Sequence, residues 1–152
     1  MGMISPDISW QDTVTLPNGA IYTGQWRKSK DESVREGRGM LVWLDGTLYE
    51  GYFKNDKASM YGRLLHKDGE LYQGEWLDDK AHGFGFYYRF DGSMYRGFWK
   101  NDQQSGKGVE HWPNGDKFEG IYRDGQKEGL GTFSWSDGNR YHGNFVANNI
   151  EG

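Results

Sequence analysis

The chain has 152 residues, enough for one ordinary domain, but only 35% of them are hydrophobic and 24 are glycine. Aromatic residues (7 Trp, 10 Tyr and 8 Phe) make up much of the apolar material, so the aliphatic supply for a compact two-layer core is thin. The absence of cysteine excludes a disulfide framework, and the net charge of −4 gives no electrostatic reason to bind nucleic acid or an anionic membrane.

The N-terminal segment carries no recognisable targeting signal. Its start, MGMISPDISW, lacks the basic and apolar regions of a signal peptide, and Pro6 stands where N-myristoylation requires Ser or Thr. No apolar run approaches the roughly 18 residues of a membrane span. We therefore expect a soluble, cytoplasmic protein in which residues 1–9 form an N-terminal extension.

One sequence motif recurs from Tyr22 to the end of the chain. It divides the array 22–152 into units at 22–48, 49–71, 72–94, 95–117 and 118–140, with a partial unit at 141–152. The unit length is 23 residues, except in the first unit, where four extra residues within RKSKDESVRE make it 27. Residues 10–21, WQDTVTLPNGAI, look like half a repeat without its glycines. Because Gly152 falls at position 12 of the last unit, the pattern predicts that the array was cut from a longer protein.

Aromatic residues and glycines occupy fixed positions in the units. Position 3 is always glycine, position 1 is Tyr22, Tyr49, Tyr72, Tyr95, Phe118 or Tyr141, and position 5 is Trp26, Phe53, Trp76, Trp99, Tyr122 or Phe145. Positions 12 and 14 are also glycine, except that Met60 replaces the first of them in the second unit. Glycine normally weakens a strand, so we interpret these glycines as hollows into which the rings of neighbouring strands fit. Next to Met60, Gly62 is expected to tolerate a side chain better than Gly85.

The alternation over positions 1–5 predicts one strand, positions 12–18 predict a second, and Asp-Gly or Asn-Gly at positions 20 and 21 indicates a hairpin into the next unit. Pro17-Asn18-Gly19 and Pro113-Asn114-Gly115 favour a three-residue loop. That loop pairs Gly83 with Trp99, Gly85 with Gly97 and Tyr87 with Tyr95, whereas a two-residue loop would flip the register. The predicted fold is all-β, an elongated single-layer antiparallel sheet of consecutive hairpins that advances ~10 Å per unit and runs roughly 50 Å.

These residues carry a family resemblance. The stretch YQGEWLDDKAHGFGFYYRFDGSMYRGFW (72–99) resembles the MORN repeat (membrane occupation and recognition nexus), whose pattern is Y-x-G-x-W, a short charged turn, H-G-x-G and D-G. The resemblance covers roughly residues 10–152. It implies a β-hairpin array that is a scaffold or binding module and not an enzyme, as in lipid kinases, junctophilins, radial-spoke heads and cytoskeletal proteins. It also implies a location at a membrane or the cytoskeleton.

Residues that could carry catalysis or bind a metal are spread along the array. The four histidines, His66, His82, His111 and His142, share no position in the repeat, so neither a zinc cluster nor a cofactor is expected. Two acidic rows have members ~10 Å apart, too far for a shared calcium ion or a carboxylate pair; they are Asp45, Asp68, Asp91 and Asp137, and Asp56, Asp79 and Asp102. We interpret them as caps of their own backbone turns. Without cysteine or a Gly-x-Ser-x-Gly motif, no catalytic residue is predicted.

Two surfaces compete as binding sites. The first is an aromatic groove, which could equally be the core of the sheet, made of Tyr22, Trp26, Trp43, Tyr49, Phe53, Tyr72, Trp76, Tyr95, Trp99, Trp112, Phe133 and Trp135. The second lies on the opposite face, made of Tyr52, Tyr61, Leu65, Phe84, Phe86, Tyr88, Phe98 and Val109, with Arg96 at its rim. Such a patch indicates an interface unless the sheet twists enough to bury it. The register places Phe86 opposite Arg96 and Phe84 diagonal to Phe98.

These surfaces favour a protein-interaction module that holds a partner peptide or helix along the array. The alternative is a phospholipid-binding module, but the one dense basic stretch, Arg27 to Lys30, is followed at once by Asp31 and Glu32. Self-association through the open strand edges at the two ends of the sheet is a third hypothesis, which would make the array a structural spacer.

Overall fold

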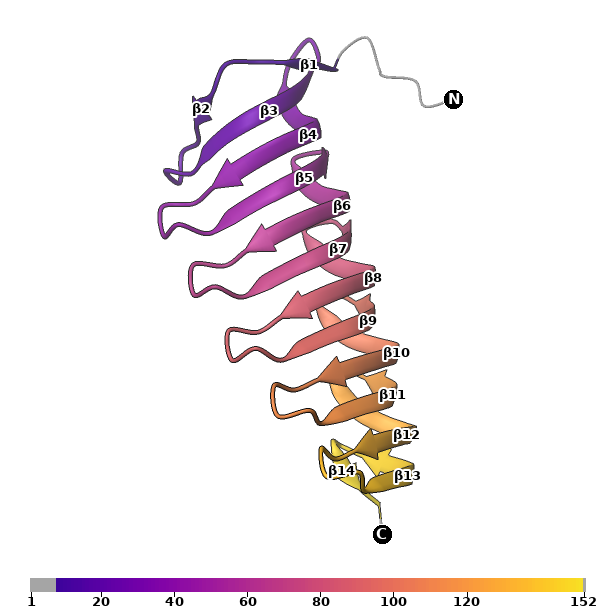
Figure 1. Ribbon diagram of the computed structural model, residues 1–152. Helices are drawn as coiled ribbons and strands as arrows, with labels where there is room; N and C mark the ends of the chain where they lie inside the picture. The colour runs from indigo at the N-terminus through magenta and orange to yellow at the C-terminus, as the bar shows by residue number, and fades with distance from the viewer. Residues whose placement is uncertain (1–7, 152) are drawn as a thin grey trace.

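The structure, a computed structural model, describes residues 8–151 as one antiparallel sheet of 14 strands and contains no helix within them (Figure 1). The strands are β1 (Ile8–Trp10), β2 (Val14–Thr15), β3 (Ile21–Lys28), β4 (Ser33–Val42), β5 (Leu48–Lys54), β6 (Lys57–Leu65), β7 (Leu71–Leu77), β8 (Lys80–Tyr88), β9 (Met94–Lys100), β10 (Gln103–His111), β11 (Lys117–Arg123), β12 (Gln126–Ser134), β13 (Arg140–Val146) and β14 (Asn149–Ile150). From β3 onward each strand pairs with the next one in the chain, while β1 and β2 both pair with β3. The all-β, single-layer prediction is confirmed. Most of the predicted extension, residues 1–7, lies outside the described residues.

The hairpins between units have the predicted register. Gly83 pairs with Trp99, Gly85 with Gly97, and Tyr87 with Tyr95. At the next such hairpin the Trp112 N–H donates to the Asp116 carbonyl oxygen (3.0 Å), and Gly115 has a φ of 96°. A three-residue loop with glycine in the left-handed region therefore joins successive units, and the two-residue alternative is wrong.

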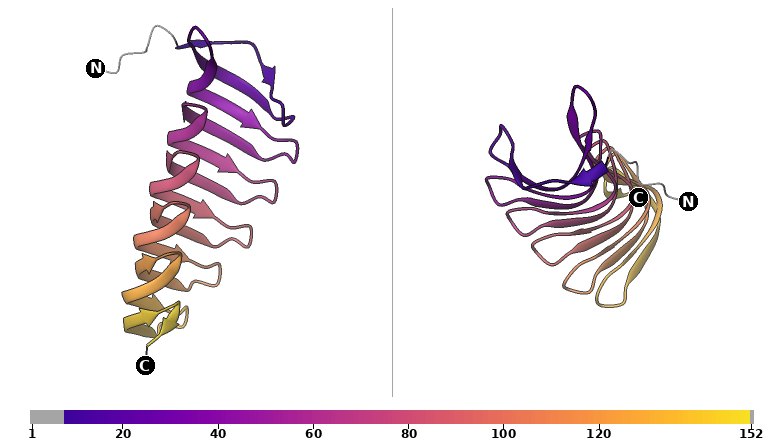
Figure 2. Two further views of the ribbon diagram at one scale, coloured as in Figure 1. Left: turned by 180° about the vertical axis from the view of Figure 1, so that it is seen from behind. Right: turned by 90° about the horizontal axis from the view of Figure 1, so that it is seen from above.

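At the opposite edge of the sheet the strands are longer than predicted. The second strand of a unit begins at position 9, as in β8, and two residues with positive φ, such as Asp78 (49°) and Asp79 (71°), close the hairpin. Both angles fit a type I′ turn. The register also shifts between Gly74 and Trp76, because β8 carries extra residues there. Bulges of this kind bend a strand, and the sheet forms an open trough when it is viewed along its length (Figure 2).

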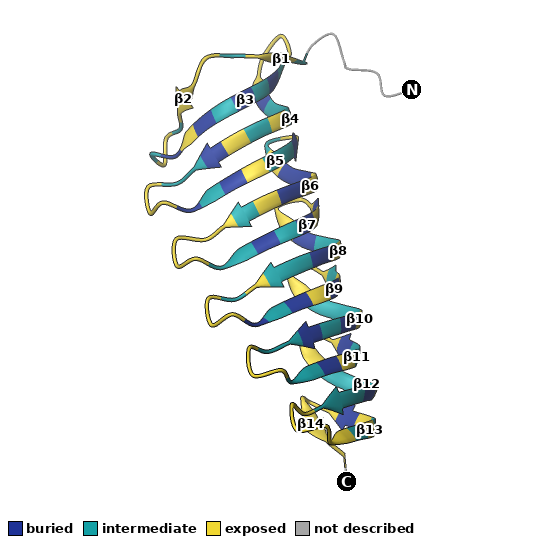
Figure 3. Cartoon of the chain, viewed as in Figure 1, coloured by how far each residue is buried: buried dark blue, intermediate teal, exposed yellow. Residues whose placement is uncertain are grey.

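The inner face of the trough holds a continuous ladder of aromatic rings. Rings from positions 1 and 5 alternate edge-to-face along the array; the Tyr95 ring, for example, lies 5.2 Å from Trp99 and 5.1 Å from Tyr122 between centroids. Tyr22, Tyr95 and Phe118 are fully buried. Figure 3 shows buried segments recurring across successive strands. A single sheet can bury whole rings because the trough wraps around the face that carries them.

The glycines make room for these rings. A Cβ atom on Gly85 would lie 2.4 Å from the Tyr72 hydroxyl oxygen, and one on Gly74 would lie 2.4 Å from the Gly85 Cα. The predicted hollows are therefore real at positions 3 and 14. They are wrong at position 12, where Gly83 (105°) and Gly129 (85°) instead have positive φ and a Cβ on Gly129 would meet no atom within 4 Å. Gly62 is as tight as Gly85, since its Cβ would lie 2.3 Å from the Tyr49 hydroxyl oxygen, so the expected tolerance beside Met60 is wrong.

The ring hydroxyls at position 1 are hydrogen-bonded within their own strand. The Tyr72 hydroxyl donates to the Glu75 carbonyl oxygen at 2.7 Å, and the Tyr49 hydroxyl donates to that of Tyr52 at 2.7 Å. Burial raises the pKa of Tyr22 to about 12, so its hydroxyl stays neutral and keeps its donated bond at ordinary pH.

The two acidic rows have different roles. The row at the three-residue loops caps its own turn, as predicted: Asp45 accepts from the Thr47 N–H at 2.9 Å, which lowers the pKa of the Asp45 carboxyl. The row at the opposite edge caps the preceding unit instead. Asp79 accepts from the Ala58 N–H (2.7 Å) while its own N–H donates to the Ala58 carbonyl oxygen (2.9 Å). We call this two-bond contact the inter-unit clasp; it also joins Asp102 to Ala81.

Candidate interaction surfaces

No metal site or membrane-spanning segment emerges from the described residues. Within 8–151, no three side chains of the metal-binding types His, Cys, Asp and Glu gather around one point. The same residues contain no helix that is long and apolar enough to cross a bilayer. His66 Nδ1 lies 3.1 Å from Asp68 and His142 Nδ1 lies 2.6 Å from the Thr132 hydroxyl, whereas the buried Nδ1 of His82 has no hydrogen-bond partner within residues 8–151.

Four rings form a cluster on the outer face of the middle units, and we call them the aromatic strip: Phe84, Phe86, Tyr88 and Phe98. The Phe84 and Phe98 rings meet at 76° with centroids 5.5 Å apart, and Phe84 meets Phe86 at 88° and 5.5 Å. The Phe86 ring stacks on Tyr88 at 6.5 Å. Phe86 pairs with Arg96, as predicted, but Phe84 lies directly opposite Phe98 and not diagonal to it. The predicted pairing of Gly83 with Trp99 and of Gly85 with Gly97 already requires this direct pairing of the two rings.

The aromatic strip is accessible to solvent. The exposed fraction is 39% for Phe84, 40% for Tyr88 and 47% for Phe98. These rings point away from the inner ladder, because positions 4 and 13 alternate with the inward-facing positions along each strand. They therefore add little to the core and leave a sizeable apolar surface in contact with water.

The other predicted outer-face residues form a separate patch. Tyr52 and Tyr61 lie on β5 and β6, where Tyr61 is 48% exposed and the Arg38 guanidinium lies 5.8 Å above the Tyr52 ring. Polar residues of β7 separate this patch from the strip, since Glu75 pairs with Tyr61 and Gln73 pairs with Phe86. Leu65 is exposed at the end of β6. The structure therefore divides the single predicted surface into two.

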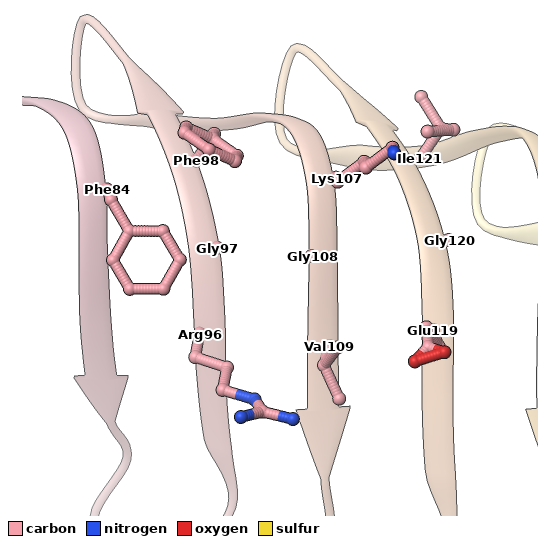
Figure 4. A pocket seen from close by; sticks show the side chains of 10 residues that line it. All are labelled: Phe84, Arg96, Gly97, Phe98, Lys107, Gly108, Val109, Glu119, Gly120 and Ile121. Atoms are coloured by element: carbon pink, nitrogen blue, oxygen red, sulfur yellow. The ribbon is translucent and has the colours of Figure 1, made fainter.

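A hollow of about 470 Å³ adjoins the aromatic strip on the outer face. We call it the glycine lane, because the backbone of Gly97, Gly108 and Gly120 forms its floor. Figure 4 shows the walls: Phe98, Lys107 and Ile121 lie on one side of the glycines, and Arg96, Val109 and Glu119 lie on the other. Phe84 closes the end towards β8. Within residues 8–151, neither Arg96 nor Lys107 forms an ion pair.

The predicted aromatic groove is mainly the core of the sheet. Its members on β3, β5 and β7 are buried, as is Tyr95 on β9, and the others are more accessible: Tyr22, Trp26, Tyr49, Phe53, Tyr72, Trp76 and Tyr95 are buried, Trp43, Trp99, Trp112 and Phe133 are half-buried, and Trp135 is exposed. A hollow of about 410 Å³ remains on the inner face of the first units, between Leu16, Tyr49 and Trp76. Most of these rings contact each other and have little surface left for a ligand.

A buried ionic cluster on the inner face was not predicted. Glu110 is 5% exposed, and its carboxylate contacts Arg89 Nη1 (3.1 Å), Lys127 Nζ (3.5 Å) and the Tyr122 hydroxyl, which donates to it. Burial and the nearby Glu110 charge raise the pKa of Tyr122. The Lys127 ammonium also lies 5.2 Å from the Phe118 ring centroid. The signal in the sequence was Glu110 at position 16, which is apolar in the other units: Leu41, Leu64, Tyr87 and Phe133.

The basic stretch of the first unit is partly neutralised by its neighbours. Arg27 Nε lies 3.3 Å from Glu36 Oε2, and Arg27 Nη2 donates to Asn55 at 3.0 Å. Lys28 and Lys30 are exposed next to Asp31 and Glu32. The stretch therefore presents no concentrated positive charge of the kind that anionic headgroups attract.

Comparison with known proteins identifies the repeats. The family profile of the MORN repeat matches residues 49–70, 72–94, 95–117 and 118–140. The phosphatidylinositol 4-phosphate 5-kinase 1 of Oryza sativa subsp. japonica is 40% identical over 63 residues, which are 41% of this chain but 7% of the kinase. Among solved structures, the Drosophila melanogaster SAS-4 (dCPAP) TCP domain in complex with a proline-rich motif of Ana2 (dSTIL) matches 93% of this chain and 85% of that one at 13% identity, with a TM-score of 0.40.

The profile matches fall on the units that were delimited from the sequence, and together they cover more than half of the chain. Each matched unit also corresponds to two consecutive strands of the sheet, and its glycines pair with glycines of the neighbouring units. This chain therefore belongs to the MORN repeat family.

Proposed function

We propose that this chain is a non-catalytic interaction module that binds an apolar segment of a partner protein on the aromatic strip. One observation carries the proposal: four contacting rings, Phe84, Phe86, Tyr88 and Phe98, cover the outer face of β8 and β9 without belonging to the core. Contiguous exposed apolar patches of this kind mark interfaces, and aromatic anchors dominate binding energies.

The inner face is a weaker candidate because its rings are already in use. They pack against each other edge-to-face, and their burial stabilises a sheet that has no second layer. A ligand on that face would have to displace contacts that hold the fold. The aromatic strip offers the same kind of side chain, and a ligand can bind there without displacing contacts of the core.

Membrane binding is not favoured, although the rice relative is named as a lipid kinase. The match covers 7% of that kinase, so the activity of the whole enzyme does not transfer to this chain. The row of exposed aspartates at the three-residue loops, including Asp45, Asp68 and Asp91, would repel an anionic surface. We expect no pelleting with liposomes that contain phosphatidylserine or phosphoinositides at physiological salt.

The test is selection from a random-peptide library, followed by affinity measurement on purified variants. We expect the double variant Phe84→Ser/Phe98→Ser to keep its melting temperature and to lose at least tenfold in affinity for the selected peptides, the equivalent of about 1.4 kcal/mol. Leu130→Ser is the matched control, because Leu130 lies in the same row, is 60% exposed and is outside the strip.

Other results would overturn the proposal. Equal losses for Leu130→Ser and the double variant would mean non-specific adhesion. A collapse of the melting temperature in the double variant would show that the strip is core. A concentration-dependent dimer in wild type that the double variant abolishes, with no peptide selected, would assign the strip to self-association.

A further inference from the structure

We propose that the segment bound by this module is an extended chain that crosses the strands in the glycine lane and places an acidic side chain between Arg96 and Lys107. This inference rests on the proposed function and specifies the chemistry of the partner. It depends on three features of the lane: its width, its charge and its continuity with the aromatic strip.

The width of the lane selects an extended chain and not a helix. Its two walls stand at positions 2 and 4 of β9 and β11, two residues apart along each strand, which is a separation of ~7 Å. An α-helix with side chains is about 10 Å across and would rest on top of the walls. The lane crosses from β8 to β11, or ~14 Å at ~4.8 Å per strand, which about four extended residues span.

The charge of the lane selects an acidic partner. Arg96 and Lys107 are exposed, stand on opposite walls of the same hollow and have no ion-pair partner within residues 8–151. Other cations, such as Arg35, Arg89 and Lys127, do contact carboxylates in this chain of net charge −4. Hydrogen bonds between a guanidinium or ammonium and a carboxylate are about twice as strong as neutral ones.

The position of the acidic group is also restricted. Glu119 stands on the same wall as Arg96, beyond Val109, and would repel a carboxylate at the β11 end of the lane. At the β8 end, Phe84 and Phe98 offer an apolar surface. The partner segment therefore has an apolar anchor over these two rings, followed within a residue or two by Asp or Glu.

The experiment uses the peptides selected on the wild-type chain. We expect them to be enriched in Asp or Glu next to an apolar residue, and expect replacement of that residue by Asn or Gln to weaken binding about tenfold. The variant Arg96→Gln/Lys107→Gln should bind the acidic and the amide peptide equally, at the weaker affinity, with an unchanged melting temperature. Lys100→Gln, an exposed change on β9 outside the lane, is the control and should leave the tenfold preference intact.

The outcomes separate this inference from the proposed function. Selected peptides that are neutral or basic, or an acid preference that survives Arg96→Gln/Lys107→Gln, would refute the inference while Phe84→Ser/Phe98→Ser still abolishes binding. If the strip variant leaves binding unchanged, the proposed function is wrong and this inference fails with it. Circular dichroism that shows a bound peptide in a helix would also overturn the extended-chain assignment.

Discussion

The inner face is built in two different ways along one unchanged backbone. In the second and third units the core is apolar: Leu64 at position 16, Ala81 at position 10 and Trp76 at position 5 belong to one cluster of apolar side chains, whereas in the first unit Arg35 at position 10 lies over the Tyr22 and Phe53 rings. In the later units the corresponding places hold Glu110, Lys127 and Tyr122, which form one buried ionic cluster. The glycine register is the same in both halves, so the backbone does not depend on which chemistry fills the trough.

This contrast shows which contacts specify the fold and which only have to be compatible with it. The glycine pairs fix the approach of neighbouring strands and recur in every unit. The side chains that fill the core differ between units, but interacting residues change together, because a buried carboxylate without its cations would cost several kcal/mol of stability. The predictions below test how far the two halves differ, starting with the largest expected effect.

Alanine at position 3 should be more damaging at Gly74 in the third unit than at Gly120 in the fifth. A Cβ on Gly74 would meet backbone atoms, at 2.4 Å from the Gly85 Cα and 2.6 Å from the Phe84 carbonyl oxygen, whereas a Cβ on Gly120 has the same backbone neighbours at 2.7 and 2.9 Å. We expect Gly74→Ala to cost about 3 kcal/mol or more and Gly120→Ala about half of that. Urea unfolding of both variants measures the difference; equal costs would contradict it.

Removing Glu110 alone should destabilise the protein much more than replacing three members of the ionic cluster together by apolar residues. Glu110→Ala leaves Arg89 and Lys127 without their shared carboxylate and should cost about 3 kcal/mol. The triple variant Glu110→Leu/Tyr122→Trp/Lys127→Ala introduces the residues found at these positions in the second and third units. Its free energy of unfolding should be within about 1 kcal/mol of that of the wild type. A triple variant as unstable as the single one would mean that the second half cannot adopt the packing of the first.

The inter-unit clasp should be removable at Asp79 and transferable to Gly125, the equivalent position in the fifth unit. Asp79 provides a carboxylate to the Ala58 N–H, whereas at the equivalent place in the fifth unit Gly125 donates to the Gln104 carbonyl oxygen without a carboxylate in return. We expect Asp79→Gly to cost about 1 kcal/mol and Gly125→Asp to gain about 0.5 kcal/mol. A Cβ on Gly125 meets no atom within 4 Å, but the φ of 82° there strains any side chain, so Gly125→Ala is the control that measures this strain. A Gly125→Asp variant no more stable than Gly125→Ala would refute the clasp as an independent contact.

The smallest effect is expected at Met60. It has a φ of 65° at the position where Gly37 (94°) and Gly83 (105°) stand in other units, and a side chain in that region is strained. We expect Met60→Gly to raise stability by about 0.5 kcal/mol, because relief of strain exceeds the added freedom of the unfolded chain. A lower melting temperature would show that the exposed methionine side chain makes a stabilising contact.

Much of the fold was predictable because the repeat encodes it locally. Pro113-Asn114-Gly115 specifies the loop, the loop specifies the register, and the register places Gly85 against Gly97. The sequence also indicated the aromatic strip, because Phe84 and Phe98 occupy positions that hold charged residues in other units, such as Lys107 and Glu75. The diagonal placement of Phe84 and Phe98 was a misreading of the predicted register, because pairing Gly83 with Trp99 and Gly85 with Gly97 already puts the two rings directly opposite each other.

The missed features join residues about 20 positions apart. The clasp between Asp79 and Ala58 links the turn of one unit to the strand of the unit before it, and depends on the stagger of the hairpins. The ionic cluster requires Glu110, Lys127 and Arg89 to converge across several strands. Neither geometry follows from the pattern within one unit. Gly62 was misjudged for a different reason: the Tyr49 ring of its own unit limits the space at Gly62, just as the Tyr72 ring does at Gly85.

The strict sequential order of the strands has a mechanical consequence. Tension applied between the two ends of the chain loads the terminal hairpin first, because from β3 onward every strand pairs with its neighbours in the chain. Under force the array should therefore peel unit by unit, each unit releasing ~70 Å as its residues go from ~10 Å along the sheet to a nearly straight chain. A protein anchored at both ends through such an array would carry an extensible spring whose length changes in regular steps.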